Sequence, residues 1–309
     1  MKIIYMGTPE FAVPPLKRLI AEGYSVPLVI SQPDRARGRG KKILPTAVKA
    51  EAEKYEIPVH QPEGKEAFQG LLQLLNRIKP DVIAVAAYGR ILPKELLDLP
   101  KFGCVNIHAS LLPKYRGAAP IQHAILSEDK KTGVTLMYMS EGMDEGDIIA
   151  SRDTAIDRKT AGELFHELSY LGSDLLIDTL PDIWKGIADR TAQEEAHATY
   201  APKIGKADCL INFKGTAAYI EKQIRAMNPR PGAYTTLKGK VMKVFSAEIE
   251  EAYKGSKPGE ICRVDDHGIS VATGEKNLLI RSVQMPGKQI LEVSEFIKGN
   301  KIEIGSVLG

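Results

Sequence analysis

The sequence predicts an α/β protein: a doubly wound, mostly parallel sheet, followed by a second, smaller domain built as a β-barrel. Strand-like and helix-like segments alternate over residues 1–180, which is typical of a parallel sheet with helices on both faces. The run DVIAVAAY (81–88) is continuously apolar, as in a central strand buried on both sides. After residue 206, short strands separated by turn residues replace this alternation, which favours a small barrel.

Apolar runs and amphipathic periods divide the first part into strands and helices. The predicted strands are KIIYM (2–6), SVPLVIS (25–31), IPVH (57–60), DVIAVAAY (81–88), CVNIH (104–108), GVTLMYM (133–139) and DIIASRDTAI (147–156). The predicted helices are PPLKRLIAEG (14–23), TAVKAEAEKY (46–55), AFQGLLQLLNRI (67–78), PIQHAILS (120–127) and TAGELFHELSYLGSDLLIDTL (160–180). Thr160 and Glu163 have the spacing of a capping box at the start of the last helix.

Periodicity fades between Asp189 and Lys206, so we predict a catalytic domain over 1–188, a linker over 189–206 and a second domain over 207–309. One helix is predicted there, GTAAYIEKQIRAMNP (215–229). The predicted strands are GAYTTL (232–237), KVMKVFSAEIE (240–250), GEICRV (259–264), GISVATG (268–274) and KNLLIRSVQ (276–284).

The composition indicates a soluble cytoplasmic protein. Of the 309 residues, 43% are hydrophobic and 26% charged, which is ordinary for a globular chain. Cys104, Cys209 and Cys262 form no CxxC pair, so we expect reduced thiols and no metal site. The N-terminal residues are expected to be a first strand rather than a signal peptide. No apolar run approaches the roughly 20 residues that span a membrane, and we expect a monomer.

Positive charge is concentrated in two places. Residues 207–309 hold 15 basic and 12 acidic side chains, whereas residues 1–206 hold 27 of each. Within the first part, no acid interrupts the basic residues between Asp34 and Glu51, which are Arg35, Arg37, Arg39, Lys41, Lys42 and Lys49. This stretch predicts a basic loop beyond the carboxyl end of the second strand.

An amide and an imidazole interrupt the apolar strand within GCVNIHASLLPKYRGAAP (103–120). Asn106 and His108 are two residues apart, so both side chains point to one face of the strand. They lie where ligands bind in such sheets, beyond the carboxyl ends of the strands. Two hydrogen-bond donors there suit a developing oxyanion, provided that His108 is charged.

A nearby carboxylate would favour the charged imidazole. The best candidate is Asp144 in SEGMDEGDI (140–148), because Gly142 and Gly146 allow a sharp turn towards a cleft. Its neighbours are rivals that the local sequence leaves open: Glu141, Glu145 and Asp147. The chain has no GxGxxG, GxxxxGK[ST] or GxSxG motif, so dinucleotide, P-loop and serine-hydrolase sites are not indicated. These residues alone support a site for polar group transfer or hydrolysis.

VNIHASLLPKYRGAAPIQ (105–122), followed by GVTLMYMSEGMDEGDII (133–149), resembles the folate-dependent formyltransferases. That family uses an Asn, a His and an Asp, and the matching residues are Asn106, His108 and Asp144. The resemblance implies a Rossmann-like catalytic domain, 10-formyltetrahydrofolate as the formyl donor and no metal. The segments SLLP and AAYGRILP match the part that binds the folate, which implies contacts from Ser110, Leu111, Leu112, Pro113, Tyr88, Ile91 and Leu92.

GTPEFAVPPL (7–16), SQPDRARGRGKK (31–42) and AMNPRPGAY (226–234) resemble the branch of this family that acts on initiator methionyl-tRNA. The resemblance implies that Arg39 contacts the acceptor stem and that Arg37, Lys41 and Lys42 neutralise phosphates. It also implies that the C-terminal domain is an oligonucleotide-binding (OB-like) barrel. The candidate tRNA contacts there are Arg225, Arg230, Lys238, Lys240 and Lys243.

Three other functions compete with this interpretation. A formyltransferase acting on a small amine, such as a sugar nucleotide or glycinamide ribonucleotide, would use the same trio, but the basic loop and the second domain argue against it. A hydrolase would release formate from the folate with water as acceptor. A non-catalytic RNA-binding protein would use His108 and Asp144 only as structural residues.

Overall fold

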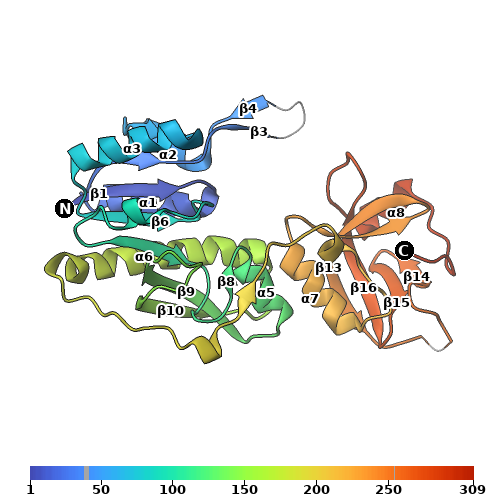
Figure 1. The fold of residues 1–309 in the computed structure, drawn as a ribbon. Helices are drawn as coiled ribbons and strands as arrows, with labels where there is room; N and C mark the ends of the chain where they lie inside the picture. Colours follow the sequence, from blue (N-terminus) through green and yellow to red (C-terminus); the bar gives the residue numbers. More distant parts are fainter. Residues whose placement is uncertain (38–41, 254) are drawn as a thin grey trace. The chain divides into compact units, whose positions relative to one another are not determined.

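A seven-stranded sheet forms the centre of the first part of the chain (Figure 1). The computed structural model describes residues 1–37, 42–253 and 255–309. In spatial order the strands are β10 (Ile148–Ala155), β9 (Lys131–Tyr138), β7 (Cys104–His108), β6 (Val82–Ala86), β1 (Lys2–Gly7), β2 (Ser25–Ile30) and β5 (Val59–His60). The five neighbouring strands β7, β6, β1, β2 and β5 are parallel to one another, whereas β9 is antiparallel to both β7 and β10. The predicted mostly parallel sheet is therefore confirmed.

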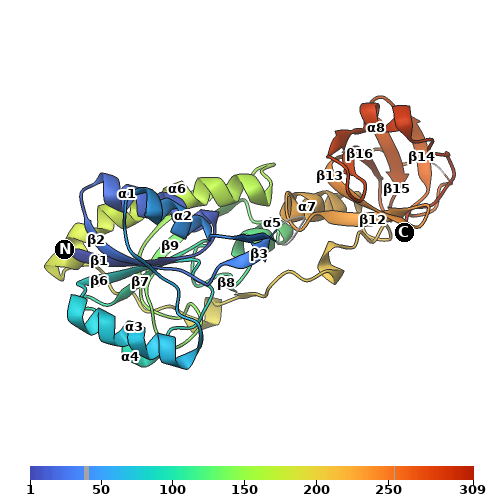
Figure 2. The same cartoon turned by 90° about the horizontal axis from the view of Figure 1, so that it is seen from above.

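Helices cover both faces of this sheet (Figure 2). The helical elements up to residue 185 are η1 (Glu10–Ala12, a 3-10 turn), α1 (Val13–Ala21), α2 (Ala47–Lys54), α3 (Gly64–Ile78), α4 (Lys94–Leu97), α5 (Pro120–Leu126) and α6 (Ala161–Lys185). Of these, α5 groups with the second unit described below. On one face, Leu71 of α3 and Leu96 of α4 join Ile83 of β6 in one buried cluster. On the other, a Cβ on Gly172 of α6 would lie 2.5 Å from Ile107, so glycine lets this helix approach β7 closely.

The capping box predicted for α6 is present. Glu163 accepts a hydrogen bond from the Thr160 backbone N–H at 2.7 Å, and the Thr160 hydroxyl accepts one from the Glu163 N–H at 3.2 Å. The two residues thus satisfy reciprocal backbone donors where the helix begins.

The basic stretch does not remain an irregular loop throughout. Part of it pairs as a hairpin of β3 (Arg35–Arg37) and β4 (Lys42–Leu44) that extends from the carboxyl side of β2 (Figure 1). Two further short strands, β8 (Arg116–Gly117) and β11 (Tyr200–Ala201), pair in parallel. A 3-10 turn, η2 (Glu195–His197), precedes β11.

The last part of the chain forms an antiparallel sheet with β12 and β14 as its outer strands. Its strands are β12 (Ala233–Leu237), β13 (Lys240–Glu250), β14 (Ile261–Asp265), β15 (Gly268–Ala272), β16 (Asn277–Gln284) and β17 (Leu291–Glu292). The helical elements are η3 (Ala207–Cys209), α7 (Ala217–Met227) and α8 (Val293–Gly299). The five predicted strands and the predicted helix are present, whereas the short α8 was not predicted. Among the described residues β12 and β14 do not pair with each other, so the predicted closed barrel is not confirmed.

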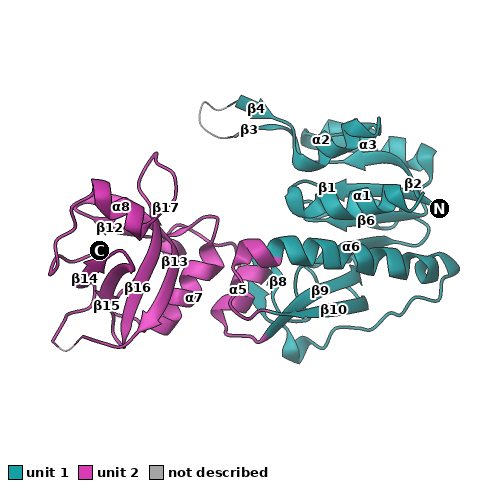
Figure 3. Cartoon of the chain, turned by 180° about the vertical axis from the view of Figure 1, so that it is seen from behind, with its two compact units in different colours: residues 1–120, 131–155, 165–201 teal, residues 121–130, 156–164, 202–309 magenta. Residues whose placement is uncertain are grey.

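The contacts divide the chain into two units (Figure 3). The first unit contains residues 1–120, 131–155 and 165–201, and the second contains residues 121–130, 156–164 and 202–309. Residues 189–201 therefore group with the parallel sheet. The domain limits 1–188, 189–206 and 207–309 stay a prediction.

Candidate active site

Strand β7 carries Asn106 and His108 at its carboxyl end. Asn106 pairs with Val85 of β6 and with Met137 of β9, so neighbours flank it on both sides. Asn106 is 9% and His108 6% exposed. Alternation along the strand places both on the same face as Cys104, which belongs to the cluster under α3 and α4. Three side chains thus form a row along one face of a central strand.

Asp144 approaches His108 from the loop between β9 and β10. Its Oδ1 lies 3.6 Å from His108 Nδ1, and its Oδ2 accepts a hydrogen bond from the Gly117 N–H at 2.9 Å. Asp144 has a φ of 55°, a left-handed conformation that Asp tolerates better than most residues. Of the acidic candidates on this loop, Asp144 is the one that the structure brings into ion-pair range of His108.

The two ring nitrogens of His108 face two acceptors. Nε2 lies 2.9 Å from the carbonyl oxygen of Tyr115, which can only accept, so Nε2 carries the hydrogen of this bond. On the other side, Nδ1 faces the carboxylate of Asp144. A doubly protonated ring satisfies both acceptors, whereas a neutral ring satisfies one.

The amide of Asn106 is available to a ligand. Its side chain makes no hydrogen bond to any residue in the described part of the chain, although the residue is nine-tenths buried. Buried amides normally have partners inside the protein. The N–H groups of Asn106 can therefore donate to a ligand oxygen placed beside His108.

The segment after β7 turns around the hydroxyl of Thr135. This hydroxyl donates to the Ser110 carbonyl at 2.7 Å and accepts from the Leu112 N–H at 3.0 Å. Ser110 is fully buried, Leu112 is buried and Leu111 is half-buried. The Leu112–Pro113 peptide bond is cis. The four residues expected to contact folate thus form a tight turn beside the carboxyl end of β7.

The other expected folate contacts differ in exposure. Tyr88 and Leu92 are 4% and 3% exposed and belong to the core cluster, and burial raises the pKa of the Tyr88 hydroxyl. Ile91 is 74% exposed. In this structure the Ile91 side chain is accessible to a ligand, whereas Tyr88 and Leu92 are buried in the core cluster.

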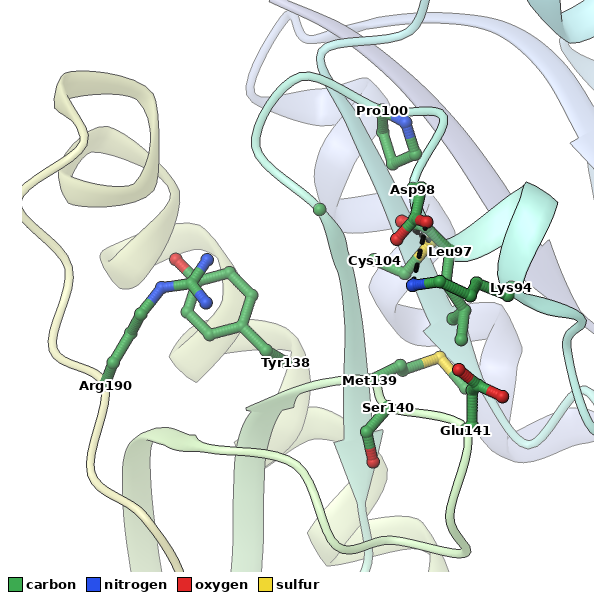
Figure 4. A pocket seen from close by; sticks show the side chains of 11 residues that line it. Lys94, Leu97, Asp98, Pro100, Cys104, Tyr138, Met139, Ser140, Glu141 and Arg190 are labelled. Atoms are coloured by element: carbon green, nitrogen blue, oxygen red, sulfur yellow. Dashed lines mark hydrogen bonds and ion pairs between the residues drawn. The ribbon is translucent and has the colours of Figure 1, made fainter.

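A cavity of about 400 Å³ opens at the beginning of β7 (Figure 4). Leu97 of α4, Cys104 and Met139 give it an apolar wall, and they pack with the core cluster that contains Tyr88 and Leu92. Burial raises the pKa of the Cys104 thiol to about 12, so this thiol is uncharged at neutral pH. Sequence reasoning missed the cavity, because its apolar residues have the same pattern as any core residue.

Charged side chains surround this apolar wall (Figure 4). They are Lys94, Asp98, Glu141 and Arg190. The Lys94 ammonium pairs with Asp98 at 3.0 Å, and the Arg190 guanidinium lies 3.7 Å from the ring centre of Tyr138. The lining of the cavity thus combines apolar and charged side chains.

The basic hairpin contributes one described candidate for tRNA contact. Lys42 is exposed in β4. Arg39, Lys41 and the side chain of Arg37 lie outside the described residues. Next to Lys42, Ile43 is 74% exposed, so the described end of the hairpin presents both charge and apolar surface.

Arg225 of the second unit is held inside its own unit. Its guanidinium binds the Glu221 carboxylate at 2.9 and 3.0 Å and the Lys159 carbonyl at 3.1 Å. Its side chain is 15% exposed and that of Glu221 is 7% exposed. These bonds occupy the Arg225 guanidinium with partners inside the unit.

The other basic candidates of the second unit lie nearer the surface. Arg230 and Lys240 are exposed and make no ion pair with any described residue. Lys238 is paired with Glu303 at 3.3 Å, and Lys243 donates to the Pro231 carbonyl at 2.6 Å. Arg230 and Lys240 are therefore the cations most available to a phosphate.

Among the described residues, no three His, Cys, Asp or Glu side chains are placed to share a metal ion. No described helix is both long and apolar enough to cross a membrane.

Two family models together match most of the chain. Residues 1–180 match the formyl transferase family, and residues 203–301 match the formyl transferase C-terminal domain.

Curated relatives match it along its whole length. It is 44% identical to the methionyl-tRNA formyltransferase of Syntrophus aciditrophicus, with 100% of this chain and 99% of the relative covered. It is 46% identical to the methionyl-tRNA formyltransferase of Alkaliphilus metalliredigens, with 100% and 98% covered.

A similar fold occurs in HypX from Aquifex aeolicus, whose structure was solved in complex with tetrahydrofolic acid. The identity is 20% and the TM-score 0.65, over 99% of this chain and 50% of HypX. The chain therefore spans about half the length of HypX, and the likeness shows a shared fold.

Proposed function

Because this chain belongs to the methionyl-tRNA formyltransferase family, we propose that Asn106, His108 and Asp144 catalyse its reaction. The enzyme transfers a formyl group to the amino group of methionyl-tRNA, giving the N-formylmethionyl-tRNA used to initiate translation. The proposed donor is 10-formyltetrahydrofolate and the proposed acceptor is the initiator tRNA. The observation that carries the residue roles is the 3.6 Å approach of His108 and Asp144 beside the unbonded amide of Asn106.

The reaction places negative charge where these donors lie. The methionine nitrogen attacks the formyl carbon, a C–N bond forms and charge develops on the formyl oxygen. Asn106 and the Nε2–H of His108, which lies at the Tyr115 carbonyl in this structure, would donate to that oxygen. Asp144 accepts the proton of the attacking amine and returns it to N10 of the folate as the C–N10 bond breaks.

We propose that the cavity beside β7 holds the pterin ring of the donor. Its volume lies in the range of about 300–1,000 Å³ that is common for small-molecule sites. Cys104 in its wall and Asn106 lie on one face of the strand two residues apart, which is about 7 Å. A pterin ring in the cavity would therefore bring N10 towards Asn106. Ile91 would cover the ring, with Tyr88 and Leu92 behind it and Ser110–Pro113 holding the end of the strand. The tetrahydrofolic acid bound to HypX supports a folate in this fold.

Basic side chains from both units are the proposed tRNA contacts. The antiparallel sheet of the second unit would act as an OB-like platform, with Arg230 and Lys240 as its most available cations. Lys238 and Lys243 would exchange their present partners for phosphates. Lys42, with Arg37, Arg39 and Lys41, would reach the acceptor stem. Arg225 is the exception, because Glu221 and backbone carbonyls satisfy it.

We expect Lys240→Ala to weaken methionyl-tRNA binding. The logarithm of the binding constant falls with the logarithm of the salt concentration, and this slope should become shallower by about 0.7–0.9 because one phosphate contact is lost. The kcat at saturating tRNA should not change. Filter binding over a series of salt concentrations measures the slope. Lys288→Ala is the matched control, because Lys288 is another exposed lysine of the second unit. A wild-type slope for Lys240→Ala would remove Lys240 from the proposed surface.

Asn106→Ala is expected to lower kcat by about 10²- to 10³-fold, the usual cost of removing one oxyanion donor. The fold should be retained, because no described residue depends on the Asn106 amide for a hydrogen bond. Steady-state formylation of methionyl-tRNA gives kcat, and thermal unfolding reports stability. A kcat within threefold of wild type would exclude Asn106 as an oxyanion donor.

Free, unpaired cysteines support a cytoplasmic location. The working form is proposed to be a monomer.

One competition experiment tests donor and acceptor together. Formyl-labelled 10-formyltetrahydrofolate is offered with methionyl-tRNA, uncharged tRNA and water. The proposed reaction leaves the label in acid-stable N-formylmethionine after the tRNA is deacylated. Label released only as formate would instead indicate a hydrolase, and absence of donor turnover would overturn the roles given to Asn106, His108 and Asp144.

A further inference from the structure

A short strip of backbone (Tyr115–Gly117, the inner strip) holds both members of the His108–Asp144 pair. The Tyr115 carbonyl accepts from His108 Nε2 at 2.9 Å, and the Gly117 N–H donates to Asp144 Oδ2 at 2.9 Å. The two contact points are two residues apart. The position of the inner strip therefore sets the distance between imidazole and carboxylate.

A second segment (193–201, the outer segment) anchors the inner strip from behind. The Tyr115 N–H donates to the Thr199 hydroxyl and the Arg116 N–H to the Thr199 carbonyl, both at 2.8 Å. The pairing continues from Arg116 to Tyr200 and from Gly117 to Ala201. A Cβ on Gly117 would lie 2.8 Å from the Ala201 carbonyl, and Gly117 has a φ of 117°, so only glycine fits this close approach.

Gln193 connects the outer segment directly to the loop of Asp144. Its amide nitrogen donates to the carbonyl oxygens of Asp144 and Gly146, both at 2.8 Å. Its amide oxygen accepts from Arg116 Nε at 3.1 Å. One side chain thus fastens two backbone carbonyls of the catalytic loop to the inner strip.

Arg116 completes this connection from inside. It is 1% exposed, and its guanidinium binds both carboxylate oxygens of Glu195 at 3.0 Å. A buried guanidinium with a two-point partner is rigid. Arg116 therefore offers a fixed donor to Gln193 rather than a mobile one.

The loop that carries Asp144 needs such an external support. Residues 140–143 and Glu145 are exposed, and Asp144 itself has a positive φ. Exposed segments with few buried contacts open at low free energy. Gln193 donates hydrogen bonds to the backbone carbonyls of Asp144 itself and of Gly146. These two hydrogen bonds resist the opening of the loop.

We infer that Gln193 and Arg116 are positioning residues that hold the Asp144 carboxylate against His108. The inference rests on the proposed roles of His108 and Asp144. All hydrogen bonds of the Gln193 side chain are to protein atoms. Removing this side chain therefore misplaces Asp144 without removing a substrate contact. A misplacement of about 1 Å can cost about 10²-fold in rate. The effect therefore falls on kcat and leaves both KM values nearly unchanged.

Two substitutions at Gln193 separate this role from simple packing. Gln193→Met removes all three hydrogen bonds at similar volume. Gln193→Glu retains an acceptor for Arg116 but directs a carboxylate oxygen at the two loop carbonyls, which repel it. Both variants are expected to lose about 10- to 10²-fold in kcat, with both KM values within about twofold of wild type.

Gln223→Glu is the matched control. Gln223 also bridges two carbonyls with its amide nitrogen, those of Asp208 at 2.8 Å and Leu210 at 3.1 Å, but it lies in the second unit. This variant should lower the thermal midpoint without lowering kcat. Thermal unfolding of each variant gives the folded fraction, so that kcat is expressed per folded enzyme.

The outcomes are distinct. A wild-type kcat for Gln193→Glu would show that Gln193 serves only Arg116 and would overturn the inference. A loss in KM instead of kcat would overturn it too, since that would place Gln193 at a substrate. If Asp144→Asn and His108→Ala were themselves fully active, the proposed roles of those two residues would fail instead.

Discussion

Replacing Asp144 by asparagine is expected to lower kcat by about 10²- to 10⁴-fold, the usual contribution of a positioned acid–base group. Asparagine has the same size and still offers an oxygen to the Gly117 N–H, which Oδ2 now accepts at 2.9 Å. It lacks the charge that faces His108 Nδ1 at 3.6 Å, and it cannot take a proton from the attacking amine. Single-turnover formylation of methionyl-tRNA isolates this chemical step.

Glu145→Gln is the control for Asp144→Asn. Glu145 follows Asp144 on the same loop, and its side chain is exposed. The same loss of one negative charge there should leave kcat unchanged. If the two variants had equal rates, charge on the loop and not the carboxylate of Asp144 would be what matters.

His108→Ala is expected to cost about 10²- to 10⁴-fold in kcat, because it removes an oxyanion donor and the partner of Asp144 at once. It also leaves the Tyr115 carbonyl without the donor that it has at 2.9 Å. We expect the effect to match that of Asp144→Asn and to exceed that of Asn106→Ala. Steady-state kinetics with both substrates saturating measures it.

His166→Ala is the control for His108→Ala, since His166 is exposed on α6. The double variant of His108 and Asp144 provides a further check. Residues that act as a unit give grossly non-additive losses, so the double variant should be little slower than the worse single one. Fully additive losses would mean that the two side chains act independently.

The shared face of Asn106 and His108 on β7 could be predicted because strand geometry is local. Side chains two residues apart share a face, so Asn106 and His108 had to point the same way. The choice among four acids could not be made from the sequence. Gly142 and Gly146 show that the loop turns, but the Gly117 N–H that meets Asp144 is 27 residues away along the chain.

The cavity and the support behind His108 and Asp144 were not predictable. Leu97 and Met139 have ordinary core patterns, and an isolated arginine such as Arg116 is usually a surface residue. Gln193 lies in a segment without hydrophobic periodicity. Hydrogen bonds to backbone carbonyls, rather than a buried apolar face, hold this segment in place. Hydrophobic periodicity indicates which side chains are buried, but it gives no information about such hydrogen bonds.

The sequence by itself determined the alternation of strands and helices, the capping box of α6 and the pairing of Asn106 with His108 on one face. Each of these follows from interactions within a few residues. Only the tertiary structure decided that Asp144 faces His108, that the Lys159 carbonyl accepts a hydrogen bond from Arg225, and that Arg116 and Gln193 hold the loop of Asp144. These contacts join residues far apart in the chain, and their geometry exists only once the sheets have formed and the strands have set the distances between loops.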